Sequence, residues 1–286
     1  MVAAASEAAR ATLAAAHDHR FGDAAGLAQA APHHGLGTLA GLAAHRVIRG
    51  YSDRDVDPRL VDLICAAALS APSKSDMQAR DLVVVTAAGT RAKLVELCGK
   101  DHWMPSAPVW IVACGNHRRQ RQIHEWRGPQ FVNDHLDAFF NASVDAAIVL
   151  GWFIAAAEAA GLGCCPISQI RNFPREVGTL LKLPERVFPV AGLTLGWPGN
   201  DGVLSPRLPL AATVHHERFD DARSRDLVDG YDRRRHAMMP LRRQRDVARF
   251  GEAAFYGWSE DKARQYADPQ RADFGAYVRA QGFKLD

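Results

Sequence analysis

Residues 133–161 of the chain, NDHLDAFFNASVDAAIVLGWFIAAAEAAG, are predicted to form one long helix that ends at Gly161. Apolar residues cover most of its circumference, which is typical of a helix buried in a large core or in an oligomer interface. Its longest uncharged run, residues 146–157 between Asp145 and Glu158, has 12 residues, whereas a membrane-spanning helix needs about 20. The stretch therefore predicts a buried helix and not a membrane span.

Apolar runs on both sides of this helix predict strands. Residues 82–86 (LVVVT) and 109–114 (VWIVAC) precede it, and residues 188–195 follow it. Residues 109–114 are apolar on both faces, so we expect this strand to be central in a sheet. Three other helices are predicted from capping and apolar spacing. The first starts at Asp57-Pro58 and ends before Pro72, the second covers residues 90–97, and the third starts at Pro174 and ends near Leu183.

Three further regions are predicted from composition. Residues 1–44 are Ala-rich and helical, with a break near residues 32–35, and residues 117–130 are polar with four Arg and indicate a mobile loop. Residues 218–249 hold ten Arg and six Asp, which fits either a solvated helical pair or an anion contact. We expect one domain with terminal extensions, divided into an N-terminal extension (1–44), a core (45–215) and a C-terminal helical extension (216–286).

The overall composition excludes several classes of protein. The 286 residues are 48% hydrophobic and 23% charged, and 35 Lys+Arg against 32 Asp+Glu give a net charge of +3. That balance argues against a nucleic-acid or membrane binder. Five Cys are an odd number in a long chain and favour a reducing compartment. The N-terminus carries Glu7 and Arg10 and does not resemble a signal peptide, so a cytoplasmic location is expected.

Common catalytic and metal-binding motifs do not occur in the sequence. Gly99-Lys100 is followed by Asp101 and lacks the other P-loop residues. No G-x-S-x-G elbow is found. Cys164 and Cys165 are adjacent, which is the wrong spacing for a zinc site. The sequence therefore predicts no P-loop, no nucleophile elbow and no metal site.

The segment HRVIRGY, residues 45–51, carries basic side chains that suit a phosphate. Arg46 and Arg49 are three residues apart, so on a helical turn they would point the same way, and His45 adds a donor. Planar guanidinium groups bind phosphate through paired hydrogen bonds. The alternative is the basic last turn of a helix, which the helix dipole favours.

Three other stretches have the chemistry of a ligand site. Residues 70–78 (SAPSKSDMQ) follow a helix and offer hydroxyl and amide groups for a sugar alcohol or a heterocycle edge, or form a plain turn. Residues 161–171 (GLGCCPISQIR) follow the long helix, and their two glycines let the backbone bend and approach a flat ligand. Arg207 lies between prolines in residues 204–209 (LSPRLP). The prolines could hold it rigidly toward a ligand, or it could be an ordinary surface residue.

In sequence order these segments resemble the FMN-dependent nitroreductase family, and within it the NADPH:flavin oxidoreductase and oxygen-insensitive nitroreductase subgroup. The likeness extends from about His45 to Pro209. It rests on the set HRVIRGY, SAPSKSDMQ, GLGCCPI, LLKLPERVFPVAGLTLGWP and SPRLP, and no single one of these motifs is specific.

The resemblance implies an α+β fold, with a mostly antiparallel central sheet flanked by helices, in an intertwined homodimer with FMN at the interface. It implies that His45, Arg46 and Arg49 hold the FMN phosphate and the pyrimidine side of the ring. Ser73, Lys74 and Ser75 would line the ribityl and phosphate path, from the other subunit.

The remaining implied contacts lie around the flavin ring and the phosphate. Gln78 would lie near the ring or the substrate pocket. Pro166, Ile167, Ser168 and Gln169 would follow the flavin face and edge, with backbone amides near N5 and O4. Lys100 would touch the flavin edge, and Arg207 would complete the phosphate clamp.

The resemblance implies an NAD(P)H-dependent FMN oxidoreductase that reduces nitroaromatics, quinones or free flavin by a ping-pong mechanism. NADPH or NADH is the co-substrate, and the partners are a second copy of the chain and small flat electron acceptors. Two alternatives stay open. One is a flavin enzyme of the same fold with oxygen-dependent or dehalogenating chemistry, and the other is a non-catalytic FMN carrier or redox sensor.

The sequence departs from the family pattern at several positions. Ser205 stands where the subgroup often has Lys, which removes one charge from the phosphate site. Residues 166–169 replace an aromatic-Ile-Gly-Gly stretch. Asp76 stands where many members have Asn, so a cation such as Lys74 is expected beside it. The basic residues that bind the NADPH 2′-phosphate in the subgroup are not visible before Trp258. The preference for NADPH or NADH therefore stays open.

Overall fold

A computed structural model describes residues 2–99 and 101–286. The chain divides into two compact units. The sheet unit comprises Arg46–Val203 and Arg271–Asp286, and the extension unit comprises Met1–His45 and Leu204–Gln270.

The sheet unit is built on four antiparallel strands in the order β1-β2-β4-β3. The strands are β1 (Arg80–Val85), β2 (Val109–Asn116), β3 (Gly163–Ile167) and β4 (Val187–Gly196). Strand β2 is central and all its residues are buried, as the apolar pattern of residues 109–114 predicts. Strand β3 is an edge strand that pairs with β4 from Gly163↔Gly196 to Ile167↔Gly192.

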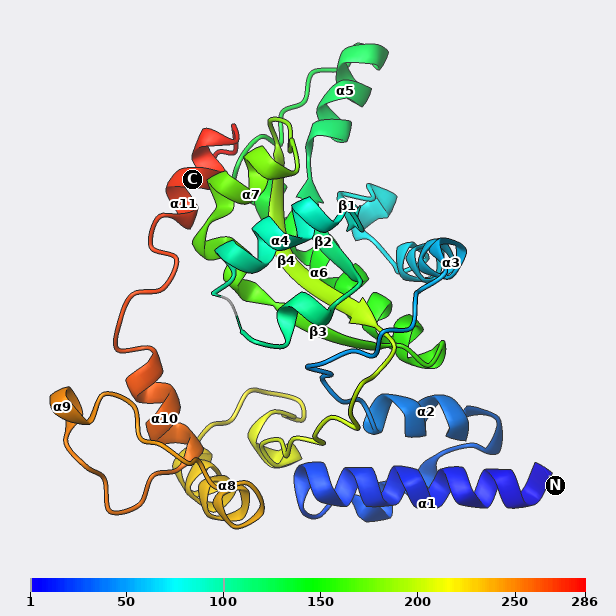
Figure 1. The fold of residues 1–286 in the computed structure, drawn as a ribbon, viewed down its shortest axis with the longest axis vertical. Coiled ribbons are helices and arrows are strands. Elements are labelled where there is room, and N and C mark those ends of the chain that lie inside the picture. Colours follow the sequence, from blue (N-terminus) through cyan, green and yellow to red (C-terminus); the bar gives the residue numbers. More distant parts are fainter. Residues whose placement is uncertain (1, 100) are drawn as a thin grey trace. The chain divides into compact units, whose positions relative to one another are not determined.

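Both faces of the sheet are covered, which confirms the expected α+β architecture. Helix α6 (Leu136–Ala159) and helix α3 (Pro58–Leu69) form a core with Ile111 of β2 and Leu193 of β4. Trp110 and Val112 of β2 point to the other face, where they pack with helices α4 (Ala88–Leu97) and α7 (Pro174–Leu180). Figure 1 shows α4 in front of the strands and α6 behind them. Alternate β2 residues thus fill two cores.

Short helices complete the sheet unit. They are η3 (Lys74–Asp76), η4 (Met104–Ser106), η5 (Ser168–Asn172), α5 (Arg118–Arg127) and α11 (Phe274–Ala280). Helix α3 begins as predicted, because the Asp57 side chain accepts a hydrogen bond from the Arg59 backbone N–H at 2.9 Å and Pro58 occupies the first turn.

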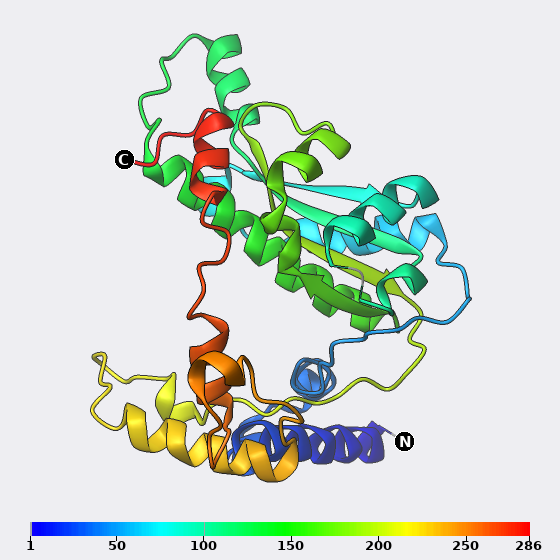
Figure 2. The same ribbon diagram turned by 60° about the vertical axis from the view of Figure 1, so that its left-hand side comes forward.

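Helix α6 is long and apolar enough to cross a membrane by length and composition alone. In the structure its inner face packs on the sheet (Figure 2). Ala142, Val149 and Phe153 on that face are fully buried. The predicted helix is therefore confirmed, and within one chain it is buried along its inner face. Its outer face exposes Phe140 (60%) and Trp152 (49%).

The extension unit is helical. It contains α1 (Val2–Phe21), η1 (Ala25–Ala30), η2 (His33–Gly35), α2 (Leu36–Ala43), η6 (Leu210–Ala212), α8 (Ser224–Met238), α9 (Val247–Phe250) and α10 (Trp258–Gln265). Buried Leu13 and Leu36 join α1 to α2. The guanidinium of Arg234 donates to the carbonyls of Arg20 (2.6 Å) and Arg207 (2.8 Å), which joins α8 to α1 and to the chain after Leu204.

The prediction of a mobile loop over residues 117–130 is wrong. Residues 118–127 form helix α5, which extends beyond the end of the sheet (Figure 1). The segment is polar all round, so it lacks the apolar stripe by which amphipathic helices are found. Its ends are capped instead: Asn116 Oδ1 accepts from the Arg119 N–H at 3.2 Å, and Gly128 adopts a φ of +94° that ends the helix.

Candidate functional site

The segment 46–51 is extended and lies along the outer edge of β3. The Ile48 backbone N–H donates to the Cys164 carbonyl at 3.0 Å, and Val47 and Tyr51 form bridges to Val203 and Pro198. The expectation that Arg46 and Arg49 share one helical turn is therefore wrong. The spacing of three was compatible with a helix, but pairing with residues 198–203 determines the conformation.

Both arginines of this segment remain exposed. Arg46 Nη1 reaches the Asp201 carbonyl at 3.3 Å, while Asn200 Nδ2 holds the Arg49 carbonyl at 3.1 Å. Burial raises the pKa of the Cys165 thiol, and the adjacent Arg49 guanidinium acts in the opposite direction. The structure thus places Arg49 beside β3, with its charge available at the strand edge.

Strand β3 offers an open backbone edge at Pro166. The Cys164 carbonyl faces away from β4, because it accepts from Ile48, and the backbone of Pro166 two residues later faces the same way. Proline, which has no N–H, is tolerated at such an edge position. The Pro166 side chain is exposed and that of Ile167 is buried. The predicted bend at residues 163–167 is a strand, and a flat ligand can approach its edge.

The predicted polar loop has an unusual backbone. Ser75, Asp76 and Gln78 have φ values of 51°, 55° and 53°, which side-chain-bearing residues rarely adopt. The Ser73 hydroxyl accepts from the Gln78 N–H at 3.1 Å across the loop. Strained conformations of this kind gather at ligand sites. Ser73, Lys74, Ser75 and Gln78 lie together on this turn at the surface.

The expected cation beside Asp76 is not found in the described part of the chain. Asp76 is exposed and accepts a hydrogen bond from Gln78 Nε2 at 3.2 Å. An exposed carboxylate stays hydrated, so that it needs no counter-charge, which is why the prediction from burial cost fails here.

Asp145 is a residue that the sequence analysis missed. It was interpreted as the boundary of an apolar run, but it lies inside α6 and is 1% exposed. Its carboxylate accepts from the backbone N–H groups of Lys74 (3.0 Å) and Ala79 (2.9 Å). The signal in the sequence was a single carboxylate on the buried face of an otherwise apolar helix, which requires hydrogen-bond partners.

Ser168 and Gln169 follow β3 in η5. Ser168 Oγ accepts from Arg271 Nη2 at 3.1 Å. Gln169 Nε2 lies 3.7 Å from the position that a Cβ on Gly99 would occupy. Gln169 is thus next to the chain that leads to Lys100, which lies outside the described residues.

His45 and Arg207 belong to the extension unit. Arg20, which is buried, donates to the His45 carbonyl at 2.5 Å and to the Ser205 carbonyl at 3.1 Å. The exposed Arg207 guanidinium reaches the carbonyls of Ser205 (3.3 Å) and Pro206 (3.2 Å). Arg207 is therefore held against its own backbone within this unit.

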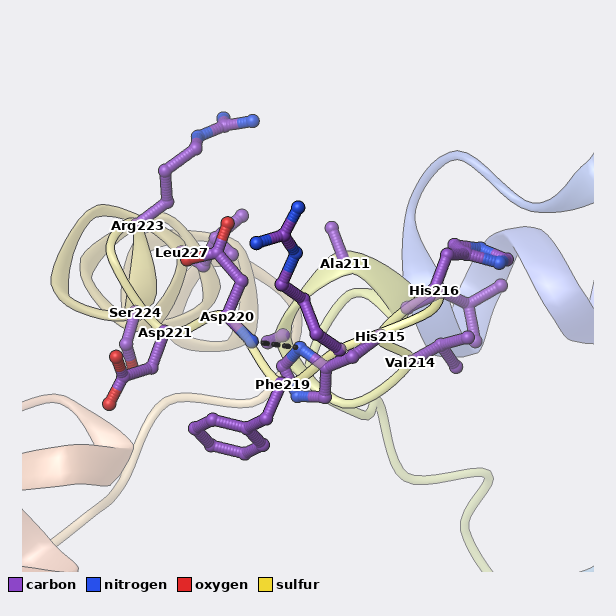
Figure 3. A pocket seen from close by; sticks show the side chains of 13 residues that line it. Ala211, Val214, His215, His216, Phe219, Asp220, Asp221, Arg223, Ser224 and Leu227 are labelled. Carbon is purple, nitrogen blue, oxygen red and sulfur yellow. Dashed lines mark hydrogen bonds between the residues drawn. The ribbon is translucent and has the colours of Figure 1, made fainter.

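The extension unit also has an open pocket of about 1270 Å³, lined by residues 210–227. Its side chains carry mixed charges and include His215, Phe219 and Asp220 (Figure 3). His215 Nδ1 accepts from the Asp220 N–H at 3.3 Å, and the His215 ring lies 4.5 Å from that of Phe219. The sequence does not predict this pocket.

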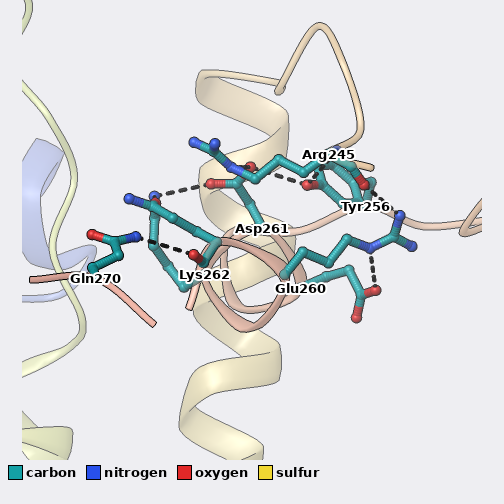
Figure 4. Close-up of polar contacts among 8 residues, drawn as sticks. Arg245, Tyr256, Glu260, Asp261, Lys262 and Gln270 are labelled. Carbon is teal, nitrogen blue, oxygen red and sulfur yellow. Dashed lines mark hydrogen bonds and ion pairs between the residues drawn. The ribbon is translucent and has the colours of Figure 1, made fainter. Parts of the chain in front are cut away.

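A second pocket, of about 660 Å³, borders a network around Asp261 (Figure 4). Asp261 accepts from Arg245 Nε (2.8 Å), Tyr256 Oη (3.0 Å) and Lys262 Nζ (2.9 Å). Burial acts to raise the pKa of Asp261, but the hydrogen bonds from Lys262, Tyr256 and Arg245 outweigh it and leave this pKa below its usual value. Arg245 is thus engaged by a carboxylate.

The cysteines do not form a redox or metal centre in the described residues. All five thiols are free, and no group of three metal-ligating side chains is present there. Burial raises the pKa of Cys98 and of Cys114 to about 12, so these thiols are protonated and unreactive.

The donors of the sheet unit fit a flavin mononucleotide. Exposed guanidinium groups suit a phosphate, the turn at 73–78 suits a polyol, and the open edge of β3 suits a planar ring. The three features come from separated parts of the sequence.

Comparisons with known proteins give matches to one family. Residues 42–197 match the model of the nitroreductase family, and residues 205–286 match that of the nitroreductase family C-terminal domain. The chain is 31% identical over 255 residues to an FMN reductase [NAD(P)H] of Bacillus subtilis, covering 87% of this chain and 98% of that protein. It is 35% identical over 182 residues to an oxygen-insensitive NADPH nitroreductase of Salmonella typhimurium, covering 64% and 74%.

A solved structure of NfrA2 from B. megaterium superposes with a TM-score of 0.78 at 33% identity, covering 87% of this chain and 98% of that one. Two family models match the chain, and its structure has an antiparallel sheet with a core helix and a basic segment on the edge strand. Together these findings define the class of protein. The chain belongs to the nitroreductase family, which confirms the resemblance identified from its sequence.

Proposed function

We propose that this protein takes hydride from NAD(P)H through bound FMN and passes it to nitroaromatics, quinones or free flavin. The chain is an oxidoreductase with FMN as its cofactor, in keeping with its family and with the FMN reductase and nitroreductase to which it is similar. The observation that carries the proposal is the Ile48–Cys164 hydrogen bond, which sets Arg49 against the open edge of β3.

The roles of the site residues follow from their chemistry. FMN supplies the hydride chemistry when it is bound. Arg46 and Arg49 bind the phosphate and the pyrimidine side of the ring, together with His45 and Arg207. The positive charge of Arg49 or His45 would stabilise negative charge on the pyrimidine side of the ring.

The other residues position the cofactor. Ser73, Lys74, Ser75 and Gln78 bind the ribityl chain and the phosphate path or border the ring. Pro166, Ile167, Ser168 and Gln169 contribute the backbone edge on which the ring lies, and Lys100 contacts the flavin edge. No side chain acts as a nucleophile or general base in this proposal.

A second copy of the chain completes the site. Among the described residues no hydrogen bond or ion pair joins the turn at 73–78 to the segment 46–49. Exposed Phe140 and Trp152 on α6 and Leu63 (64%) on α3 offer an apolar surface for that copy. The proposed protein is thus a homodimer in which each turn serves the site of the partner, and its balanced charge and free thiols suit the cytoplasm.

The test is a visible spectrum of the purified protein, followed by anaerobic titration with NADH and NADPH in separate experiments. Bound FMN should be reduced by at least one of them, and a quinone or nitroaromatic added afterwards should restore the oxidised spectrum. Parallel initial-velocity lines would support the ping-pong order. A colourless protein that binds no added FMN would overturn the proposal.

A further inference from the structure

Asp145 is the one ionisable residue on the buried face of α6. The other buried side chains of that face belong to Asn141 and to apolar residues such as Val149 and Phe153. A carboxylate is costly to bury unless charge-assisted hydrogen bonds replace its water. What Asp145 binds therefore indicates why a carboxylate is present at this position.

Asp145 binds both ends of the polar turn. One carboxylate oxygen accepts from the Lys74 N–H at 3.0 Å and the other from the Ala79 N–H at 2.9 Å. The three left-handed residues, Ser75, Asp76 and Gln78, all lie between these two anchored amides. The carboxylate thus closes the turn from the core side of the sheet unit.

The turn needs such a closure because its backbone is unfavourable. Each left-handed residue with a Cβ raises the energy of the folded turn, and none of the three is Gly. On the exposed side, the Ser73 hydroxyl makes one further cross-link to the Gln78 N–H at 3.1 Å. The core anchor and the surface cross-link together hold the hydroxyl and amide side chains on one exposed face.

We infer that Asp145 is the positioning residue of the flavin site. Its carboxylate pre-forms the turn at 73–78 in the flavin-free protein, so that FMN binds without first ordering that segment. The inference rests on the proposed function, because it assigns the turn to FMN. Pre-organisation of this kind raises affinity by removing the ordering cost from the binding step.

The test is Asp145→Asn, which keeps the size of the side chain and one accepting oxygen but presents an NH₂ group to the other backbone N–H. Hydrogen exchange of the flavin-free protein should be at least about tenfold faster at Lys74 and Ala79. The FMN dissociation constant, measured by flavin fluorescence, should rise about ten- to hundredfold, as expected for a lost charge-assisted hydrogen bond.

Asn141→Ala is the matched control. Asn141 lies one turn earlier on α6, is also buried, and donates to Asp137 Oδ2 at 2.7 Å. Its loss should lower stability without changing exchange at residues 74–79 or FMN affinity. If Asp145→Asn behaves like this control, Asp145 is a structural core residue and the inference is wrong.

Two further variants separate the possible failures. If Asp145→Asn does not fold, Ser73→Ala removes the exposed cross-link and should shift exchange and FMN affinity in the same direction. If Arg49→Ala weakens FMN binding while Asp145→Asn leaves both the exchange at residues 74–79 and the FMN affinity unchanged, the inference fails and the proposed function stands. If none of the three changes FMN affinity, the proposed site itself is wrong.

Discussion

The backbone N–H of Ile48 donates to the carbonyl of Cys164 at 3.0 Å. The Ile48 side chain lies directly over Gly163, the residue that precedes Cys164 in β3. A Cβ added to Gly163 would come within 2.5 Å of Ile48 Cγ1 and 2.7 Å of its Cβ. The basic segment can follow β3 only because this residue has no side chain. The arrangement of the site therefore depends on a contact between a glycine and an isoleucine.

Gly163→Ala should displace the basic segment from the strand. Overpacking at a buried site costs about 1–3 kcal/mol, so the variant should be less stable and should bind FMN more weakly. Gly230→Ala is the control, because a Cβ there meets nothing within 4 Å on helix α8. That change should stabilise the protein by about 1 kcal/mol. Equal thermal shifts and equal FMN affinities for the two variants would contradict the argument.

Arg49→Ala should weaken FMN binding without affecting folding. Arg49 is exposed, and its backbone carbonyl keeps its hydrogen bond from Asn200 Nδ2. Loss of a hydrogen bond to a charged group costs about 1.5–3 kcal/mol, so the dissociation constant should rise about ten- to hundredfold. Arg59→Ala, also an exposed arginine of the sheet unit, removes the same charge. If both variants bind FMN equally, Arg49 has no role in the site.

Arg207→Ala tests the phosphate clamp from the extension unit. The exposed guanidinium donates hydrogen bonds to the neighbouring carbonyls of Ser205 and Pro206, so the fold should survive its removal. FMN should be lost more readily on dilution, by about 1.5–3 kcal/mol. The measurement is the flavin retained after gel filtration, and retention equal to that of the wild type would remove Arg207 from the site.

His117 should make the folded state sensitive to mild acid. Burial, followed by the charges of Arg121 and Arg186, lowers its pKa from 6.5 to about 4. The native imidazole stays neutral while the unfolded one takes up a proton, so stability is complete above pH 6.5 and falls as the pH drops toward 4. The loss should reach about 3 kcal/mol.

The control for this pH dependence is His117→Phe, which keeps an aromatic ring between Phe131 and Phe283. The difference in melting temperature between pH 7 and pH 5 should shrink in the variant. An unchanged difference would mean that another group causes the acid sensitivity. Asp134 provides the clearest contrast. Burial acts to raise its pKa, but hydrogen bonds and charges from Arg121 and Arg186 outweigh burial and lower this pKa to about 2. The stability that Asp134 contributes is therefore lost at lower pH than that of His117.

The sequence predicted those elements whose pattern is local. The strand at 109–114, the helix at 133–161 and the helix that begins at Asp57-Pro58 were found because apolar periodicity and capping lie within each segment. Strand β3 was not found, because its five residues, GCCPI, have little strand propensity and are held by pairing with β4.

The site was predictable in its residues but not in its geometry. The segments that carry Arg49, Ser73 and Pro166 were recognised by their resemblance to a family. Nothing in residues 75–78 indicates left-handed backbone, because Ser, Asp and Gln take that conformation here through contacts with distant residues. A carboxylate on α6 determines this geometry, and its partners are backbone groups that leave no trace in the sequence.

Trp152→Glu should separate the proposed dimer and thereby reduce FMN binding. Trp152 is 49% exposed on the outer face of α6, and a buried Trp at an interface contributes about 2 kcal/mol or more. Sedimentation velocity should show a shift toward monomer, together with a rise in the FMN dissociation constant. Trp126→Glu, on α5 and 68% exposed, is the matched control and should leave both unchanged. A monomeric Trp152→Glu variant that still binds FMN as tightly as the wild type would show that one chain forms the whole site.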